Sequence, residues 1–68
     1  MATEWITYDP DADALAIEFA AGRATWRTVT VVEGVRLDLD RQGRPITLEI
    51  LDASRRVRPA LLGGLPAP

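Results

Sequence analysis

Large apolar side chains alternate with small or polar ones along three stretches of this chain, and that period of two most constrains its fold. In residues 14–19 the odd positions are all large and apolar, whereas the even positions are alanine or glutamate. Residues 35–40 alternate without a fault, and residues 46–50 repeat the pattern. Because successive side chains of a strand point to opposite faces of a sheet, each stretch predicts a strand with one buried face.

Two further stretches predict strands by their residue types. Residues 3–8 are rich in aromatic and β-branched side chains and place Ile6 and Tyr8 on one face. Residues 25–32 are almost wholly β-branched apart from Trp26, and such side chains favour strands. We expect Trp5 and Trp26 to cover the small core.

Short turns separate these stretches and set their pairing. Pro10 follows Asp9 as in a type I turn, and glycine closes the breaks at residues 20–22, 33–34 and 41–44. Because short connections favour pairing between neighbours in sequence, we predict a mainly β fold. Its architecture would be an antiparallel β-meander of four to five strands with a short C-terminal helix.

The register follows from the faces, since a slip of one residue would move every apolar side chain to the wrong side. The predicted pairs are Tyr8 with Leu15, Ile6 with Ile17, Val35 with Ile50, Leu37 with Leu48, and Leu39 with Ile46. The turn at residues 33–34 would then place Arg27 opposite Asp40 and leave Val29 and Val31 on the polar face. Either a bulge re-aims these valines, or the C-terminal segment or another subunit covers that face.

The alternation stops after Leu51. Asp52 or Ser54 is a candidate cap for a short helix over residues 53–58, because short polar side chains accept the free N–H groups of a first turn. Residues 59–68 hold three leucines and five glycines or prolines, which predicts either a frayed tail or an arm over an apolar face. We therefore divide the chain into one β-rich domain, residues 1–58, and a tail, residues 59–68.

The chain has only 68 residues and contains neither cysteine nor histidine. Disulfides, the usual zinc sites and Ser-His or Cys-His dyads are thereby excluded. A core of this size rarely supplies more than about 3–5 kcal/mol, so oligomerisation is the remaining common source of stability. We predict a homodimer, with an apolar excess as its candidate interface: Val29, Val31, Leu61, Leu62 and Leu65.

The charge pattern bears on possible partners. Ten acidic residues outnumber eight basic ones, all of them arginine and scattered along the chain, which disfavours binding to nucleic acid. No apolar run has the length of a membrane span or a signal peptide. We expect a cytoplasmic protein that does not bind membranes.

Two acidic patterns resemble metal-binding loops. Asp9, Asp11 and Asp13 alternate, but the glycine and glutamate of a calcium loop are missing at the matching positions. Residues 38–49 match that spacing fully, yet they read as two strands rather than as a loop between helices. We expect turn and strand formation here, with no metal, no cofactor and no catalytic residue.

Three motifs in order give the chain a family likeness: Tyr8-Asp9 with a second aspartate at Asp13, residues 33–38, and the closing run Glu49-Ile50-Leu51-Asp52-Ala53-Ser54. Together they resemble the bacterial proteins grouped as domain of unknown function 2283, from about Ile6 to Val57. Thr47 stands where that family often has glycine. The resemblance implies a small β-rich domain, sometimes encoded beside toxin-like proteins, and it supplies no catalytic residue. Its signature residues, Tyr8, Asp9, Asp13, Glu49 and Asp52, are interpreted as structural.

The function that these observations favour is a non-enzymatic module that dimerises or binds a small protein partner. The family resemblance adds an antitoxin-like role as one form of partner binding. The alternative is a small enzyme or metal-binding protein that uses acidic residues gathered at a dimer interface. A carboxylate cluster in a concave site would favour this alternative.

We predict that neither acidic pattern binds calcium with useful affinity. Asp9, Asp11 and Asp13 lack ligands at the required spacing, and residues 38–49 form a strand hairpin rather than a helix-flanked loop. The melting temperature should therefore be the same with millimolar calcium as with a chelator. A rise of several degrees with calcium that the chelator reverses would contradict the prediction.

Overall fold

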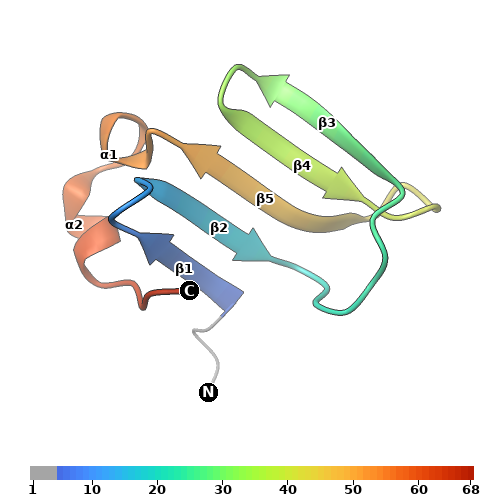
Figure 1. Cartoon of the computed structure of the whole chain (residues 1–68), viewed down its shortest axis with the longest axis horizontal. Coiled ribbons are helices and arrows are strands. Elements are labelled where there is room, and N and C mark those ends of the chain that lie inside the picture. The colour runs from blue at the N-terminus through green and yellow to red at the C-terminus, as the bar shows by residue number, and fades with distance from the viewer. Residues whose placement is uncertain (1–4) are drawn as a thin grey trace.

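The computed structural model describes residues 5–68 and shows five strands in one antiparallel sheet, with two short helices at one end (Figure 1). The strands are β1 (Ile6–Asp9), β2 (Ala14–Glu18), β3 (Arg27–Val32), β4 (Val35–Leu39) and β5 (Pro45–Leu51). The helices are α1 (Ala53–Arg56) and α2 (Pro59–Gly63). The predicted fold class is confirmed. The first two residues of the predicted strand at residues 3–8 lie outside the described residues.

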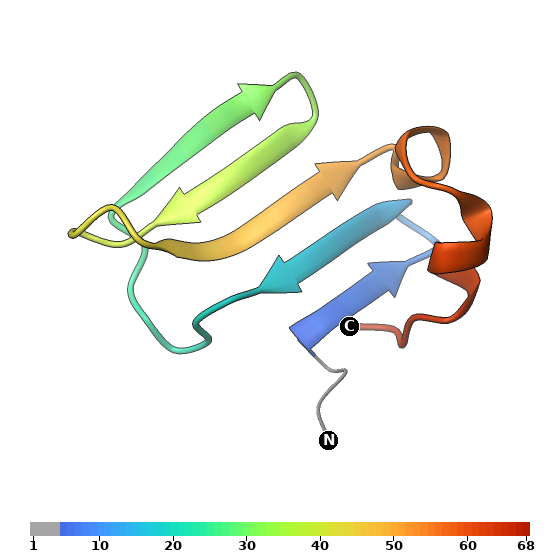
Figure 2. The ribbon, with the colours of Figure 1, turned by 180° about the vertical axis from the view of Figure 1, so that it is seen from behind.

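The strand order is β1-β2-β5-β4-β3, so one pair of sequence neighbours does not meet. The hairpin expected between β2 and β3 at residues 20–22 is wrong, because β5 and β4 lie between these strands. The linker instead crosses the end of the sheet (Figures 1 and 2). The Phe19 and Ala20 amides both donate to the Ile46 carbonyl, and the Trp26 amide donates to the Leu39 carbonyl. These bonds fasten both ends of the linker to β5 and β4.

Most of the predicted register is present in the sheet. The pairs are Tyr8 with Leu15, Ile6 with Ile17, Val35 with Ile50, and Leu37 with Leu48. Leu39 instead pairs with Pro45, because the register between β4 and β5 shifts after Asp38. The prediction that Leu39 pairs with Ile46 is therefore wrong by one residue, next to the turn that joins the two strands.

A bulge in β3 resolves the position of the two valines. The register around it pairs Val32 with Val35, Thr30 with Arg36, Val29 with Leu37, Thr28 with Asp38, and Arg27 with Leu39. Val31 is the extra residue, and it returns Val29 to the apolar face, as the bulge alternative predicted. The expectation that Arg27 lies opposite Asp40 is wrong for the same reason.

Most of the core lies at the end of the sheet where the helices stand (Figures 1 and 2). Leu15, Ala53 and Leu62 are buried there, and the half-buried Tyr8 and Ile50 pack against them. Ile46, which is 5% exposed, is buried at the start of β5, where the β2–β3 linker bonds to it. The chain measures 34 × 31 × 17 Å, and its short third dimension corresponds to a single sheet layer. The helices thus cover only the end of the apolar face where β1, β2 and β5 meet them.

Both tryptophans lie outside this core. Trp5 is 50% exposed and Trp26 is 52% exposed, so the expectation that they cover the core is wrong. The physical reason is that the second layer is made by α1 and α2, at the opposite end of the sheet from the linker that carries Trp26.

The C-terminal segment forms two helical turns rather than a continuous helix. Pro59 begins α2, and a proline is well tolerated there because the first amides of a helix have no internal acceptor. Leu62 is buried in the core, and the Pro66 carbonyl accepts a bond from the Tyr8 amide (2.9 Å). The segment therefore packs on the sheet as an arm. Within residues 5–68, no helix is long and apolar enough to span a membrane.

Candidate functional site

Asp13 joins the β1–β2 turn to the start of α1. Its carboxylate accepts bonds from the Tyr8 hydroxyl (2.6 Å), the Ser54 hydroxyl (2.7 Å) and the Ser54 amide (3.0 Å). Its carbonyl also accepts a bond from the Ala53 amide (3.0 Å). One aspartate thus fixes a tyrosine of β1 and the first turn of a helix 40 residues away.

The same contacts explain how α1 begins. The expected cap by Asp52 or Ser54 is wrong, since Asp52 has a left-handed backbone (φ 53°) and makes no side-chain cap bond. Asp13 accepts the Ser54 amide in place of a local cap. Sequence analysis looks for a capping residue within the same segment, so it does not find a cap that a distant turn supplies.

The protonation states in this network favour a structural role. The hydrogen bond to Asp13, and then burial, raise the pKa of Tyr8. The bonds from the Tyr8 and Ser54 side chains lower the pKa of Asp13 despite its partial burial. At neutral pH the tyrosine therefore donates to an ionised carboxylate, and neither group is poised to exchange a proton.

The remaining signature residues lie in two places. Asp9 accepts bonds from the Asp11 amide (3.0 Å) and the Ala12 amide (3.4 Å), so it closes its own turn. Glu49 lies apart from the others on the polar face, where Arg36 donates to it (3.0 Å). The structure thus brings together Tyr8, Asp9 and Asp13 with the start of α1, but not Glu49.

A shallow hollow of about 270 Å³ surrounds Glu49 on the polar face. The Arg36–Glu49 ion pair forms one wall, and the bond from the Thr28 hydroxyl to Asp38 (2.7 Å) forms another. The Glu49 and Arg36 side chains are 42% and 49% exposed. Each carboxylate of the hollow already has a partner within the chain, so this surface lacks a free acid or base.

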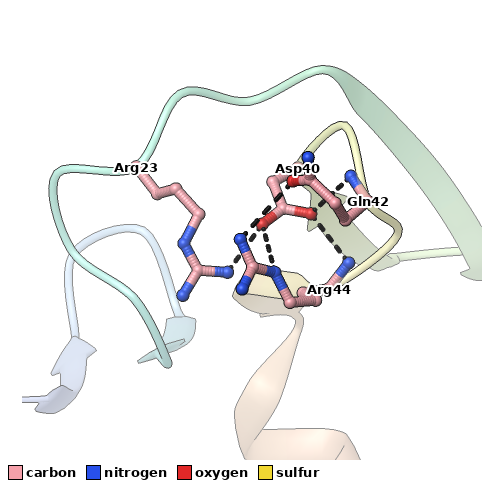
Figure 3. A network of polar contacts seen from close by, with 4 residues as sticks. All are labelled: Arg23, Asp40, Gln42 and Arg44. Atoms are coloured by element: carbon pink, nitrogen blue, oxygen red, sulfur yellow. Dashed lines mark hydrogen bonds and ion pairs between the residues drawn. The ribbon is translucent and has the colours of Figure 1, made fainter.

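Asp40 is the one buried polar or charged residue among residues 5–68, at 3% exposure. Its carboxylate accepts bonds from the Arg23 side chain (2.7 Å), the Arg44 side chain (2.9 Å), and the Gln42 and Arg44 amides (both 2.9 Å), as Figure 3 shows. Burial alone would raise the pKa of Asp40, but these hydrogen bonds outweigh it and lower the pKa to about 2. Asp40 thereby ties the β2–β3 linker to the β4–β5 turn.

Sequence reasoning missed this centre. The spacing of Asp40 and Arg44 around Gly43 was a usable local signal for a charged turn. The pairing with Arg23 had no such signal, because it depends on the linker crossing the end of the sheet. Within the calcium-like pattern of residues 38–49, the third residue, Asp40, pairs with two arginines of the chain. Among residues 5–68, no three acidic side chains form a group that could hold a metal ion.

The candidate interface residues differ in their exposure. Val31 is 54% exposed and Leu61 is 48% exposed, whereas Val29 and Leu65 are half-buried. Leu62, at 6%, belongs to the core of its own chain. Leu62 and Leu65 also line an apolar hollow of about 470 Å³ beside Tyr8 and Pro59. The exposed valine of the set lies on β3, an edge strand of the sheet.

Comparison with known families gives one match. The sequence profile of the family described as "Protein of unknown function (DUF2283)" matches residues 5–54, which is more than half of the chain. The matched range includes all five strands and the five signature residues, and it ends at Ser54 within α1. No curated protein and no solved structure matches the chain.

We predict that the signature contacts at Asp13 stabilise the fold, whereas Glu49 contributes little. Replacing Ser54 by alanine removes the hydroxyl bond to Asp13 and should lower the free energy of unfolding by about 1 kcal/mol. The Glu49→Gln change affects an exposed ion pair and should cost less than about 0.5 kcal/mol. Urea unfolding of the two variants measures both values. A larger loss for Glu49→Gln than for Ser54→Ala would show that this assignment is wrong.

We also predict that Asp40 contributes to acid unfolding. Its pKa in the folded chain, about 2, lies below the ordinary value of 3.8, so the unfolded chain binds the proton first as the pH falls. The stabilisation should be complete above about pH 4 and be lost between pH 4 and pH 2. Melting curves of Asp40→Asn should therefore depend less on pH in this range than wild type, with exposed Asp11→Asn as the control. Equal pH dependence in Asp40→Asn and wild type is the contrary result.

Proposed function

We propose that this chain, which belongs to the DUF2283 family of proteins of unknown function, is a non-enzymatic module that forms homodimers in the cytoplasm. In this proposal a second copy covers the apolar face of the sheet. The observation that carries it is a sheet of one layer whose apolar face the helices cover at one end only. Sheets in stable domains bury one face against a second layer, and residues 5–68 supply only the two short helices for that layer.

The uncovered part of this face is a continuous apolar row. The register aligns one side chain from each strand across the sheet: Ile6, Ile17, Leu48, Leu37 and Val29. All five are only half-buried in the single chain. Val32, on the same face as its partner Val35, is 55% exposed. A row of this kind supports docking of another apolar surface.

The exposed area also supports a second copy. The chain exposes 4795 Å², whereas a compact monomer of 7.4 kDa exposes about 4200 Å². The chain therefore exposes more surface than a compact monomer of its mass, and association would cover part of it. Two such faces would pack as a β-sandwich about 10 Å apart.

The opposite face of the sheet is polar, which supports docking through the apolar face only. Arg36 donates to Glu49 there, and the Thr28 hydroxyl donates to Asp38, so this face stays polar. This face is suited to water, so the apolar face is the one that needs a cover. A twofold dimer satisfies that need, because each subunit offers the surface that the other lacks.

The alternative functions have less support. An enzyme or metal site built on acidic residues needs free carboxylates, but Asp13, Asp40 and Glu49 already bind groups of the chain. A small protein partner, including an antitoxin-like complex, would use the same apolar face. A second copy is favoured because it carries the same apolar row, so no other protein has to be assumed.

We predict that a charge on the apolar face disrupts the association, whereas the same charge on the polar face does not. Val32→Glu places a carboxylate in the contact, and Thr30→Glu places it on the opposite face of the same strand. At micromolar concentration, light scattering should show a mass for Val32→Glu of half the wild-type value or less, and an unchanged mass for Thr30→Glu.

Circular dichroism should show both variants folded, since both positions are exposed in the single chain. The wild-type melting temperature should also rise with protein concentration, because association stabilises the folded state. A wild-type mass near 7.4 kDa, or a Val32→Glu mass equal to wild type, would overturn the proposal.

A further inference from the structure

The two edges of the sheet differ in how they are covered. The arm after α2 runs along β1, where the Pro66 carbonyl accepts the bond from the Tyr8 amide (2.9 Å). At the other edge, β3 forms the outer strand, and no other part of residues 5–68 lies against its outer side (Figures 1 and 2). Uncovered edges offer unpaired backbone groups to another strand.

The hydrogen-bond pattern shows which groups of β3 face outward. The Leu51 amide donates to the Gly34 carbonyl (2.8 Å), and bonded pairs recur at every second residue of an antiparallel ladder. Arg36 and Asp38 therefore direct their backbone groups to β5, and Leu37 directs its groups to Val29 of β3. It follows that the N–H and C=O groups of Thr28 and Thr30 point away from the sheet.

We propose that β3 pairs antiparallel with β3 of a second copy around a twofold axis at Val29. Thr28 then lies opposite Thr30 of the partner subunit, and Thr30 lies opposite Thr28 of the partner subunit. Each of these two pairs exchanges two backbone bonds, because both residues present their groups to the edge. Val29 meets the partner's Val29 on the apolar face.

The side chains of β3 fit this register. Arg27 is the one charged residue of the strand, and it lies opposite Val31 of the partner subunit, so like charges do not face each other. The threonines meet on the polar face, and the valines join the two apolar rows into one. Proline and lysine, which protect many natural edges, are absent from the strand. The bulge at Val31 confines regular pairing to Thr28 through Thr30.

The two contacts are compatible in one closed assembly. The axis between the paired edges runs perpendicular to the sheet, whereas the axis between packed faces runs parallel to it. Perpendicular twofold axes generate a tetramer with D2 symmetry, which is a common closed form. The tetramer rests on the proposed function, because it needs the face contact as well as the edge contact. The edge contact does not depend on the face contact.

The test compares two substitutions at one edge position. Thr28→Pro removes the outward N–H, and a proline is tolerated on an edge strand. Thr28→Val keeps that N–H and loses the side-chain bond to Asp38, as the proline variant also does. Light scattering should give wild type and Thr28→Val a mass near four times 7.4 kDa, and Thr28→Pro half of that mass.

The outcomes separate the two contacts. Wild type and Thr28→Pro both at the dimer mass would overturn the edge and leave the face contact supported. A wild-type dimer that Thr28→Pro converts to a monomer would support the edge and overturn the face contact. An equal tetramer mass for Thr28→Pro and wild type would overturn the edge contact.

Hydrogen exchange of the wild-type protein gives a second readout that does not depend on how the proline variant folds. In the paired assembly, the Thr28 and Thr30 amides should exchange as slowly as the Val29 amide, which is bonded within the sheet. Exchange of both threonine amides at least tenfold faster than that of Val29 would overturn the proposal.

Discussion

The structure depends on one constraint, which is that a sheet buries its side chains only where a second layer covers it. The helices are two short turns at one end, and they bury Leu15 beneath Ala53 and Leu62. Beyond them, no helix or strand of residues 5–68 covers the apolar face, so most of its side chains stay half-buried. This limits the core and leaves Val31 and Val32 of β3 exposed.

A charged hydrogen-bonded centre holds each end of the sheet. Asp13 fastens α1 to the β1–β2 turn, and Asp40 fastens the long linker to the β4–β5 turn. In both centres the carboxylate accepts several bonds, and such bonds are about twice as strong as neutral ones. The two aspartates therefore position the helices and the linker, which hydrophobic packing alone would leave loosely held.

The sequence predicts local pairing well and distant pairing poorly. Tyr8 meets Leu15 and Leu37 meets Leu48 because alternation and a short turn together determine a hairpin register. The β2–β5 pairing joins segments about 30 residues apart, and no turn residue encodes it. The ion pair of Arg23 with Asp40 and the cap that Asp13 supplies to α1 both depend on that distant pairing. They were not predicted for the same reason.

The signature residues and the open surfaces occupy different parts of the molecule. Tyr8, Asp9 and Asp13 build a turn and hold a helix, and their hydrogen-bonding groups are directed at the chain itself. The apolar row and the β3 edge consist of ordinary valines, leucines and threonines, whose pattern is that of any strand. A motif can therefore identify this fold while the apolar row and the β3 edge carry no motif, because a strand edge offers backbone groups that every residue except proline supplies. The function of such a chain is then found from what its sheet leaves uncovered.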